Sequence, residues 1–256
     1  MPLIPFELQT YKLESIQQHL VYQQISRHSR RAGIELHDID KLPTRKLTLH
    51  GGILADEVGL GKTFSIIALL QSRPELTLIV CPARLCKQWL HEINQFSSLK
   101  AWIVADSRQY KNFDTKKDNY NTIICPDSIF TNVKCLEKDG GIQKRKWGRV
   151  VIDEAHEYFG LVGRAKKKVN TRRAFFELES NSTWLVTGTP TTEMWRWRDY
   201  LSIICKTDCD SSIFETCRTK LSEVIKHMYI RNTKLSLKNK LNIPLLCLKT
   251  CCWNRL

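Results

Sequence analysis

The stretch GGILADEVGLGKTFSIIALL, residues 51–70, places a glycine-rich turn between an apolar run and a second, apolar-periodic segment. Gly59 and Gly61 leave room for backbone N–H groups to converge on an anion, and a following helix would direct its positive end there. Lys62 would then reach the β- and γ-phosphates of a nucleotide, and the Thr63 hydroxyl would hold Mg²⁺. A plain strand–turn–helix does not require a lysine and a threonine directly after its last glycine.

The phosphate-loop pattern G-x-x-x-x-G-K-[ST] is met except at its first position, where Asp56 stands. The nucleotide prediction therefore depends on a partner motif elsewhere in the chain. The candidate cofactor-binding residues in this loop are Asp56, Glu57, Val58, Gly59, Leu60, Gly61, Lys62 and Thr63.

Short apolar runs alternate with amphipathic segments from residue 51 onward. This alternation predicts an α/β fold, a mostly parallel sheet with helices on both faces. Ligands of such sheets lie at the carboxyl ends of the strands, so motifs that follow strands are site candidates. Apolar periodicity also predicts helices over 8–31 and 83–96. The predicted strands are 51–55, 76–81, 101–105, 121–125, 149–153 and 183–188.

The segment RVVIDEAHEYF, residues 149–159, supplies the partner motif. Its apolar strand ends in Asp153 and Glu154, so both carboxylates would emerge at the same edge of the sheet as the phosphate loop. Asp153 is placed to bind the Mg²⁺ held by Thr63, and Glu154 to orient and deprotonate an attacking water. An isolated pair of acidic residues would be read as a solvated helix cap, but this pair follows a phosphate loop.

Three motifs in this order, DEVGLGKT, DEAH and TGTP, resemble the ATP-binding lobe of superfamily two helicases. More narrowly, they resemble the Swi/Snf-type helicase-like ATPases, which translocate on duplex DNA. Asp56 and Glu57 before the loop are typical of that family. The segment LIVCPARLCKQWLHEINQF is similar to its next motif at Pro82, Ala83 and Trp89. MYIRNTK followed by LNIPLL resembles the end of its first lobe, so the resemblance covers roughly residues 8–244.

The resemblance implies a RecA-like P-loop NTPase lobe with ATP and Mg²⁺ as cofactors. Its catalytic residues would be Glu154, Lys62 and Asp153, with Thr63 and Asp153 as the Mg²⁺ ligands. His156 is similar in position to the histidine that links the nucleotide site to the TGTP segment. The residues that would sense the nucleotide state and pass it to the nucleic-acid surface are Thr187, Gly188 and Thr189.

The same resemblance implies a domain organisation. Residues 1–48 would form an N-terminal helical segment, 49–244 the RecA-like ATP-binding domain, and 245–256 the start of a linker to an absent second lobe. In the family a second RecA-like lobe supplies arginine fingers, which are worth about 10³–10⁵ in rate. We therefore expect very slow hydrolysis by this chain alone. Glu193 stands where the family usually has asparagine, which affects the expected coupling.

Composition agrees with a nucleic-acid partner. The chain has 40 Lys and Arg against 26 Asp and Glu, a formal net charge of +14, and such a balance favours a polyanion, duplex DNA first. The alternative explanation of this net charge is that it only keeps the protein soluble. The basic stretches 143–149 and 163–173 suit phosphate contacts, whereas the WRW of 194–200 suits packing in the core or between lobes. The sequence has no secretory signal or apolar run of membrane-spanning length.

The chain has ten cysteines but no C-x-x-C pair, so reduced thiols are favoured over a zinc site. Because reduced thiols are typical of the cytosol and nucleus, we expect a nuclear or cytoplasmic protein that is not secreted. The leading interpretation is the ATP-binding lobe of a DNA-dependent translocase. The alternatives are a DEAH-type RNA or DNA helicase, a truncated fragment that binds ATP and DNA weakly, and a P-loop ATPase without a nucleic-acid role. Duplex-stimulated ATPase without strand separation would distinguish the first from the second.

Overall fold

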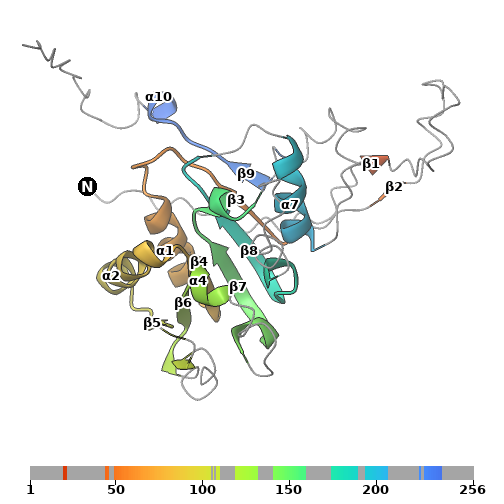
Figure 1. Cartoon of the computed structure of the whole chain (residues 1–256). Helices are drawn as coiled ribbons and strands as arrows, with labels where there is room; N and C mark the ends of the chain where they lie inside the picture. The colour runs from red at the N-terminus through yellow and green to blue at the C-terminus, as the bar shows by residue number, and fades with distance from the viewer. Residues whose placement is uncertain are drawn as a thin grey trace, which may run out of the picture.

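The computed structural model of the chain (Figure 1) describes residues 20–21, 44–45, 49–104, 106, 108–109, 119–131, 141–159, 174–189, 194–206, 225 and 228–237. Its centre is a seven-stranded sheet in the order β5-β6-β4-β7-β8-β3-β9, and all six pairings are parallel. The strands are β3 (Gly51–Leu54), β4 (Thr77–Cys81), β5 (Ala101–Ile103), β6 (Thr122–Pro126), β7 (Trp147–Ile152), β8 (Ser180–Val186) and β9 (Tyr229–Ile230).

Helices lie between these strands and after the last one. The longer ones are α1 (Lys62–Ser72), α2 (Cys86–Phe96) and α7 (Met194–Cys205), and the shorter ones are α4 (Asp127–Phe130) and α10 (Lys234–Leu237). Single 3₁₀ turns cover Ala83–Leu85, Ile142–Lys144 and Ala155–Glu157. Because all the pairings in this sheet are parallel, the carboxyl ends of the strands gather at one edge.

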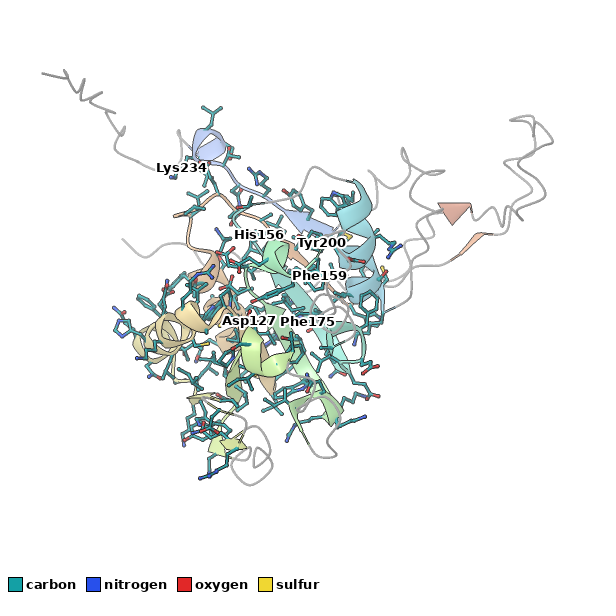
Figure 2. The ribbon with its side chains drawn as sticks, viewed as in Figure 1. Asp127, His156, Phe159, Phe175, Tyr200 and Lys234 are labelled. Atoms are coloured by element: carbon teal, nitrogen blue, oxygen red, sulfur yellow. The ribbon has the colours of Figure 1, made fainter. Side chains whose placement is uncertain are left out.

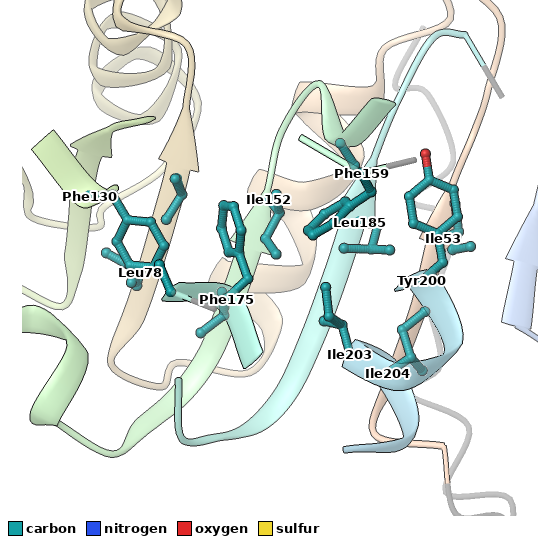
Figure 3. Close-up of a cluster of buried hydrophobic side chains, with 14 of the residues drawn as sticks. Ile53, Leu78, Phe130, Ile152, Phe159, Phe175, Leu185, Tyr200, Ile203 and Ile204 are labelled. Atoms are coloured by element: carbon teal, nitrogen blue, oxygen red, sulfur yellow. The ribbon is translucent and has the colours of Figure 1, made fainter. Parts of the chain in front are cut away.

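The two faces of the sheet carry separate hydrophobic clusters. Side chains of α1 and α2 pack with Ile79 of β4 and Val151 of β7 on one face. Their strand neighbours, such as Leu78 and Ile152, point the other way and pack under α7 and α4 (Figure 3). Successive side chains of a strand alternate between faces, so strands buried on both sides consist of unbroken apolar runs. The predicted α/β fold, with a parallel sheet between helices, is confirmed.

Most predicted elements are present. All six predicted strands appear within a few residues of their expected bounds, and the helix predicted over 83–96 is the turn Ala83–Leu85 followed by α2. The sequence did not predict β9, whose two residues are too few to show a period of two. It pairs with β3 and completes the sheet beyond the phosphate-loop strand.

The helix predicted over 8–31 lies outside the described residues except at two positions. There the structure has a strand: β1 (Leu20–Val21) pairs antiparallel with β2 (Thr44–Arg45). A short apolar stretch fits either a helix or a strand, and here the pairing with β2 determines which one forms. Residues 1–48 and 245–256 otherwise fall outside the described part, so both domain boundaries stay predictions.

The described residues contain no helix long and apolar enough to cross a bilayer. Four cysteines, Cys81, Cys86, Cys125 and Cys205, are buried there as free thiols. Within the same residues no group of three or more His, Cys, Asp or Glu side chains is arranged to hold a metal ion. The other six cysteines lie outside the described residues: Cys135, Cys209, Cys217, Cys247, Cys251 and Cys252.

Candidate functional site

The glycine-rich loop between β3 and α1 has the backbone of an anion cradle. Gly59 has φ 87° and Gly61 has φ 78°, a left-handed conformation that glycine adopts without strain. The loop is closed by a hydrogen bond from Leu60 N to Glu57 O, and α1 begins at once at Lys62. Since the first N–H groups of an α-helix have no partner within the helix, this end of α1 is free to donate to an anion.

The Lys62 side chain folds back over this loop. Its Nζ donates to the carbonyl oxygen of Asp56 at 2.9 Å. The same ammonium lies beside Gly188, because a Cβ built on Gly188 would stand 3.4 Å from Lys62 Nζ and 2.8 Å from Val58 Cγ2. The phosphate loop and the TGTP segment, far apart in the sequence, are therefore in contact at the carboxyl edge of the sheet.

Asp153 follows the last residue of β7 at this edge and is held from two sides. Its Oδ2 accepts a hydrogen bond from Trp89 Nε1 at 2.8 Å, and its Oδ1 accepts one from Glu154 N at 2.9 Å. Burial raises the pKa of the Asp153 carboxyl, while the two hydrogen bonds and the charge of Lys62 lower it. Because β3 and β7 run parallel in one sheet, the phosphate loop and the acidic motif that follow them lie at the same edge.

Glu154 and His156 continue the site toward TGTP. Glu154 takes the left-handed conformation, φ 51°, which turns the chain sharply at the end of β7. The Nδ1 of His156 lies 3.3 Å from Glu154 Oε2 and 2.9 Å from Thr187 Oγ1, and Thr189 N donates to the same hydroxyl at 3.1 Å. Figure 2 places His156 in the turn that follows β7. The structure brings these predicted residues together, and their part in coupling stays a prediction.

The acidic side chains before the loop have partners that sequence reasoning did not identify. Asp56 Oδ1 accepts hydrogen bonds from Asn232 N at 2.7 Å and Asn232 Nδ2 at 2.9 Å. Glu57 Oε2 accepts one from Lys234 N at 2.7 Å, and Arg231 donates to the carbonyl oxygen of Ala55. Together with a hydrogen bond from Ala55 N to Ile230 O, these contacts fasten residues 230–234, from the last residue of β9 onward, to the loop. A direct contact between the two carboxylates and a nucleotide stays a prediction.

Trp89 is a second residue whose contact with the site was missed. It belongs to α2 and reaches Asp153 from 64 residues away in the sequence. The resemblance marked its position in a motif but gave it no role. The sequence indicates this contact only in part. A buried tryptophan usually needs an acceptor for its N–H, but the sequence does not identify the acceptor.

The basic stretches have three different outcomes. In 143–149 Trp147 is fully buried and the Arg149 side chain is 1% exposed, at the amino end of β7. The expected phosphate contacts are therefore wrong for these two residues, because apolar packing at the strand start removes them from solvent. Trp197 is buried in the core cluster and packs edge-on against Tyr200 and Tyr229, so core packing is confirmed for it, and packing between lobes stays a prediction. The stretch 163–173 lies outside the described residues.

Comparisons with known proteins agree with this geometry. The sequence matches the SNF2-related domain family over residues 16–248. It is 31% identical over 150 residues to the "Probable global transactivator" of Orgyia pseudotsugata multicapsid polyhedrosis virus, a match over 55% of this chain and 28% of the relative. It is 30% identical over 172 residues to "DNA repair protein rad8" of Schizosaccharomyces pombe, covering 55% of this chain and 14% of that protein.

Among solved structures, the chain superposes on the "SWI2/SNF2 ATPase core in complex with dsDNA" of Sulfolobus solfataricus. The TM-score is 0.60 at 22% identity, over 72% of this chain and 40% of that one. This likeness supports the fold. The chain spans well under half the length of each of these proteins.

Proposed function

The chain belongs to the family of SNF2-related domains, and from this membership we propose that it is the ATP-binding lobe of a DNA-dependent ATPase that moves along duplex DNA. The observation that carries the proposal is the convergence of three motifs at one edge of the sheet. Lys62 lies beside Gly188, Asp153 follows β7 at the same edge of the sheet, and His156 bonds to Thr187. A phosphate cradle, a carboxylate pair and a responsive turn are thereby combined in one site.

The residues present fit a magnesium nucleotide. Mg²⁺ prefers oxygen ligands, and the residues that would hold it here are the half-buried Thr63, through its hydroxyl, and the buried Asp153, through its carboxylate. Each Asp153 oxygen accepts one N–H, which leaves lone pairs for further contacts. When bound, the ion neutralises phosphate charge. The loop from Asp56 to Thr63 would bind the phosphates, with Lys62 moving from the Asp56 carbonyl to an oxygen of the nucleotide.

Glu154 is the proposed general base. Its carboxylate is half-exposed and lies beside His156, so it can accept a proton from a water held above the phosphate loop. In this step the water oxygen bonds to the γ-phosphorus, the bond from that phosphorus to the β–γ bridging oxygen breaks, and ADP leaves. His156 would hold Glu154 in position while its contact with Thr187 transmits the change to the TGTP turn.

A second RecA-like lobe is the proposed partner that completes the site. Lys62 lies over the phosphate loop, and an opposing arginine would further stabilise the charge that develops on the transferred phosphoryl group. Turnover by residues 1–256 alone is expected to be slow.

Duplex DNA is the proposed nucleic-acid partner. The supporting observations are the net charge of +14, relatives named as DNA repair proteins, and a structural neighbour solved with dsDNA. Contacts from lysine and arginine to phosphate would be independent of sequence and strongly dependent on salt. With such a partner we propose that the protein acts in the nucleus or cytoplasm.

The test uses this chain together with a second lobe from a family member, added in trans or by fusion. We expect ATP turnover that rises with duplex DNA and no separation of DNA strands. Strand separation would favour the helicase alternative, and turnover that ignores DNA at every salt concentration would remove nucleic acid from the function. In the chain alone, Lys62→Ala should abolish the rise in Tm that Mg·ATP produces; an unchanged rise would refute the phosphate-loop assignment.

A further inference from the structure

We propose that Trp89 is a positioning residue for the metal-binding carboxylate: its indole N–H fixes the orientation of Asp153 and thereby sets the affinity for Mg²⁺. The proposal deepens the function proposed above and rests on it. It concerns a residue of α2, which lies outside the phosphate loop and the DEAH and TGTP segments, and so extends the nucleotide site to a fourth element.

The contact itself has the geometry of a strong, directed hydrogen bond. Trp89 Nε1 lies 2.8 Å from Asp153 Oδ2, and the two residues are 2% and 8% exposed. The indole nitrogen can only donate, so the direction of this bond is fixed. A bond to a charged acceptor is shorter and about twice as strong as a neutral one. Water has little access to compete at this depth.

The second oxygen of Asp153 is held as well. Its Oδ1 accepts the backbone N–H of Glu154 at 2.9 Å. With one donor on each oxygen, the plane of the carboxylate cannot rotate about the Cβ–Cγ bond without breaking a hydrogen bond. A carboxylate offers about four lone-pair positions, so about two remain for a metal ion after these two hydrogen bonds. Groups behind a metal ligand that fix its orientation typically contribute about 10–100-fold in metal affinity.

The helix that carries Trp89 is tied to the same segment a second time. Arg84, in the turn just before α2, forms an ion pair with Glu157 in the turn after Asp153. The ring of Trp89 packs in the cluster of α1 and α2 that includes Ile93 and Val151. These contacts hold α2 against the end of β7, so the indole N–H is presented to Asp153 at a constant position.

Two other buried tryptophans separate this role from ordinary packing. Trp184 of β8 lies in the same cluster and is 3% exposed, yet among the described residues its Nε1 has no hydrogen-bond acceptor. Trp147 donates to the carbonyl oxygen of Ile142 at 2.9 Å, at the opposite end of β7. Of these three indoles, Trp89 is the one whose N–H meets a carboxylate.

The experiment compares Trp89→Phe with Trp184→Phe in the complete chain. Both variants shrink a buried ring, but only the first removes a hydrogen bond to Asp153. At a fixed ATP concentration, MgCl₂ is titrated from an EDTA-treated baseline and Tm is followed. We expect the Mg²⁺ concentration at half of the Tm rise to increase about tenfold in Trp89→Phe. In Trp184→Phe this Mg²⁺ concentration should stay within about twofold of the value for the unaltered chain, even if the variant has a lower Tm in the absence of nucleotide.

Equal midpoints in the two variants would overturn the proposal and leave the proposed function standing, since the unaltered chain would still bind Mg·ATP. An unaltered chain whose ATP-dependent Tm rise ignores Mg²⁺ would overturn both. If Trp89→Phe folds poorly, a second measurement on the unaltered chain tests the proposal. The indole ¹⁵N–¹H resonance that Asp153→Asn perturbs most should also shift when MgCl₂ is added to the ATP-bound protein, and its failure to shift would refute the proposal.

Discussion

The two ends of β7 each bury a charge, and only one of them belongs to a site. At the amino end the Arg149 guanidinium donates twice to the carbonyl oxygen of Arg73, both bonds at 3.2 Å, with Glu75 at 3.8 Å. At the carboxyl end Asp153 accepts from Trp89 and Glu154 and lies near Lys62. Burial disfavours the charged form of both groups, lowering the pKa of Arg149 and raising that of Asp153.

The two buried groups differ in how many further hydrogen bonds or ligand contacts each can still form. The terminal nitrogens of Arg149 are committed to a neighbouring loop, and its Nε has no acceptor among the described residues. Asp153 keeps lone pairs beside a loop built for anions. Buried charge therefore indicates function only where the group retains unused bonding capacity toward a space that a ligand can enter.

The sharpest test of this comparison is Glu154→Gln, matched with Glu75→Gln at the amino end. With a second lobe present, we expect Glu154→Gln to lower ATP turnover by about 10²–10⁴-fold while ATP still raises Tm, because the amide cannot accept the proton of the attacking water. Glu75→Gln should leave turnover unchanged. Steady-state ATPase rates check this prediction, and equal rates for the two variants would contradict it.

Arg149→Ala tests the other end. We expect a loss of about 2–4 kcal/mol in the free energy of unfolding, because a fully buried side chain is removed and the Arg73 carbonyl loses its donors. Urea denaturation measures the loss. The ATP concentration at half-saturation should not change for the folded fraction. A large change there would mean that the two ends of β7 are coupled.

Asn232→Ala concerns the strap of residues 230–234 that fastens the phosphate loop. Removal of the Asn232 amide takes one hydrogen bond from Asp56, and we expect a loss of about 1–2 kcal/mol in unfolding free energy, with weaker ATP binding. Its control is Asn121→Ala, which removes the acceptor for Lys100 N at the amino edge. Calorimetric ATP titration should show weaker binding in the first variant only; a similar change in both would deny the strap a special role.

The smallest effect is expected for Gly188→Ala. The added methyl group would meet Val58 at 2.8 Å and come within 3.4 Å of the Lys62 ammonium. Since the exposed Val58 side chain can turn away, we expect only about a three- to tenfold loss of ATP affinity, about 1 kcal/mol. Gly148→Ala, where a Cβ would meet Glu75 at 2.7 Å, should lower Tm without changing ATP affinity. Unchanged affinity in Gly188→Ala would mean that the TGTP turn does not constrain the loop.

The sequence predicts the sheet and the phosphate loop because both are local patterns. Apolar runs such as Thr77–Cys81 are buried at every residue, and Gly59 and Gly61 occupy positions that need a left-handed backbone. The acidic motif and its histidine were predicted through their order after the loop. These features depend on spacing along the chain, which a single sequence displays directly.

The contacts that were missed join distant segments. Trp89 and Asp153 are 64 residues apart, and Asp56 and Asn232 are 176 apart. Nothing in a local pattern states that an acidic residue before a phosphate loop accepts hydrogen bonds from a later strand end. The burial of Trp147 and Arg149 was missed for a related reason, since a basic stretch reads as solvated until the strand that contains it is placed inside the sheet.

The position of β3 between β8 and β9 has a consequence for synthesis of the chain. A ribosome adds about 5–20 residues per second, so the 176 residues between Asp56 and Asn232 take about 9–35 s. Through that interval β3 is outside the exit tunnel without its final neighbour, and unpaired strand edges attract other chains. We expect the nascent polypeptide to depend on chaperones until β9 emerges, and ATP to become a folding ligand only after that moment.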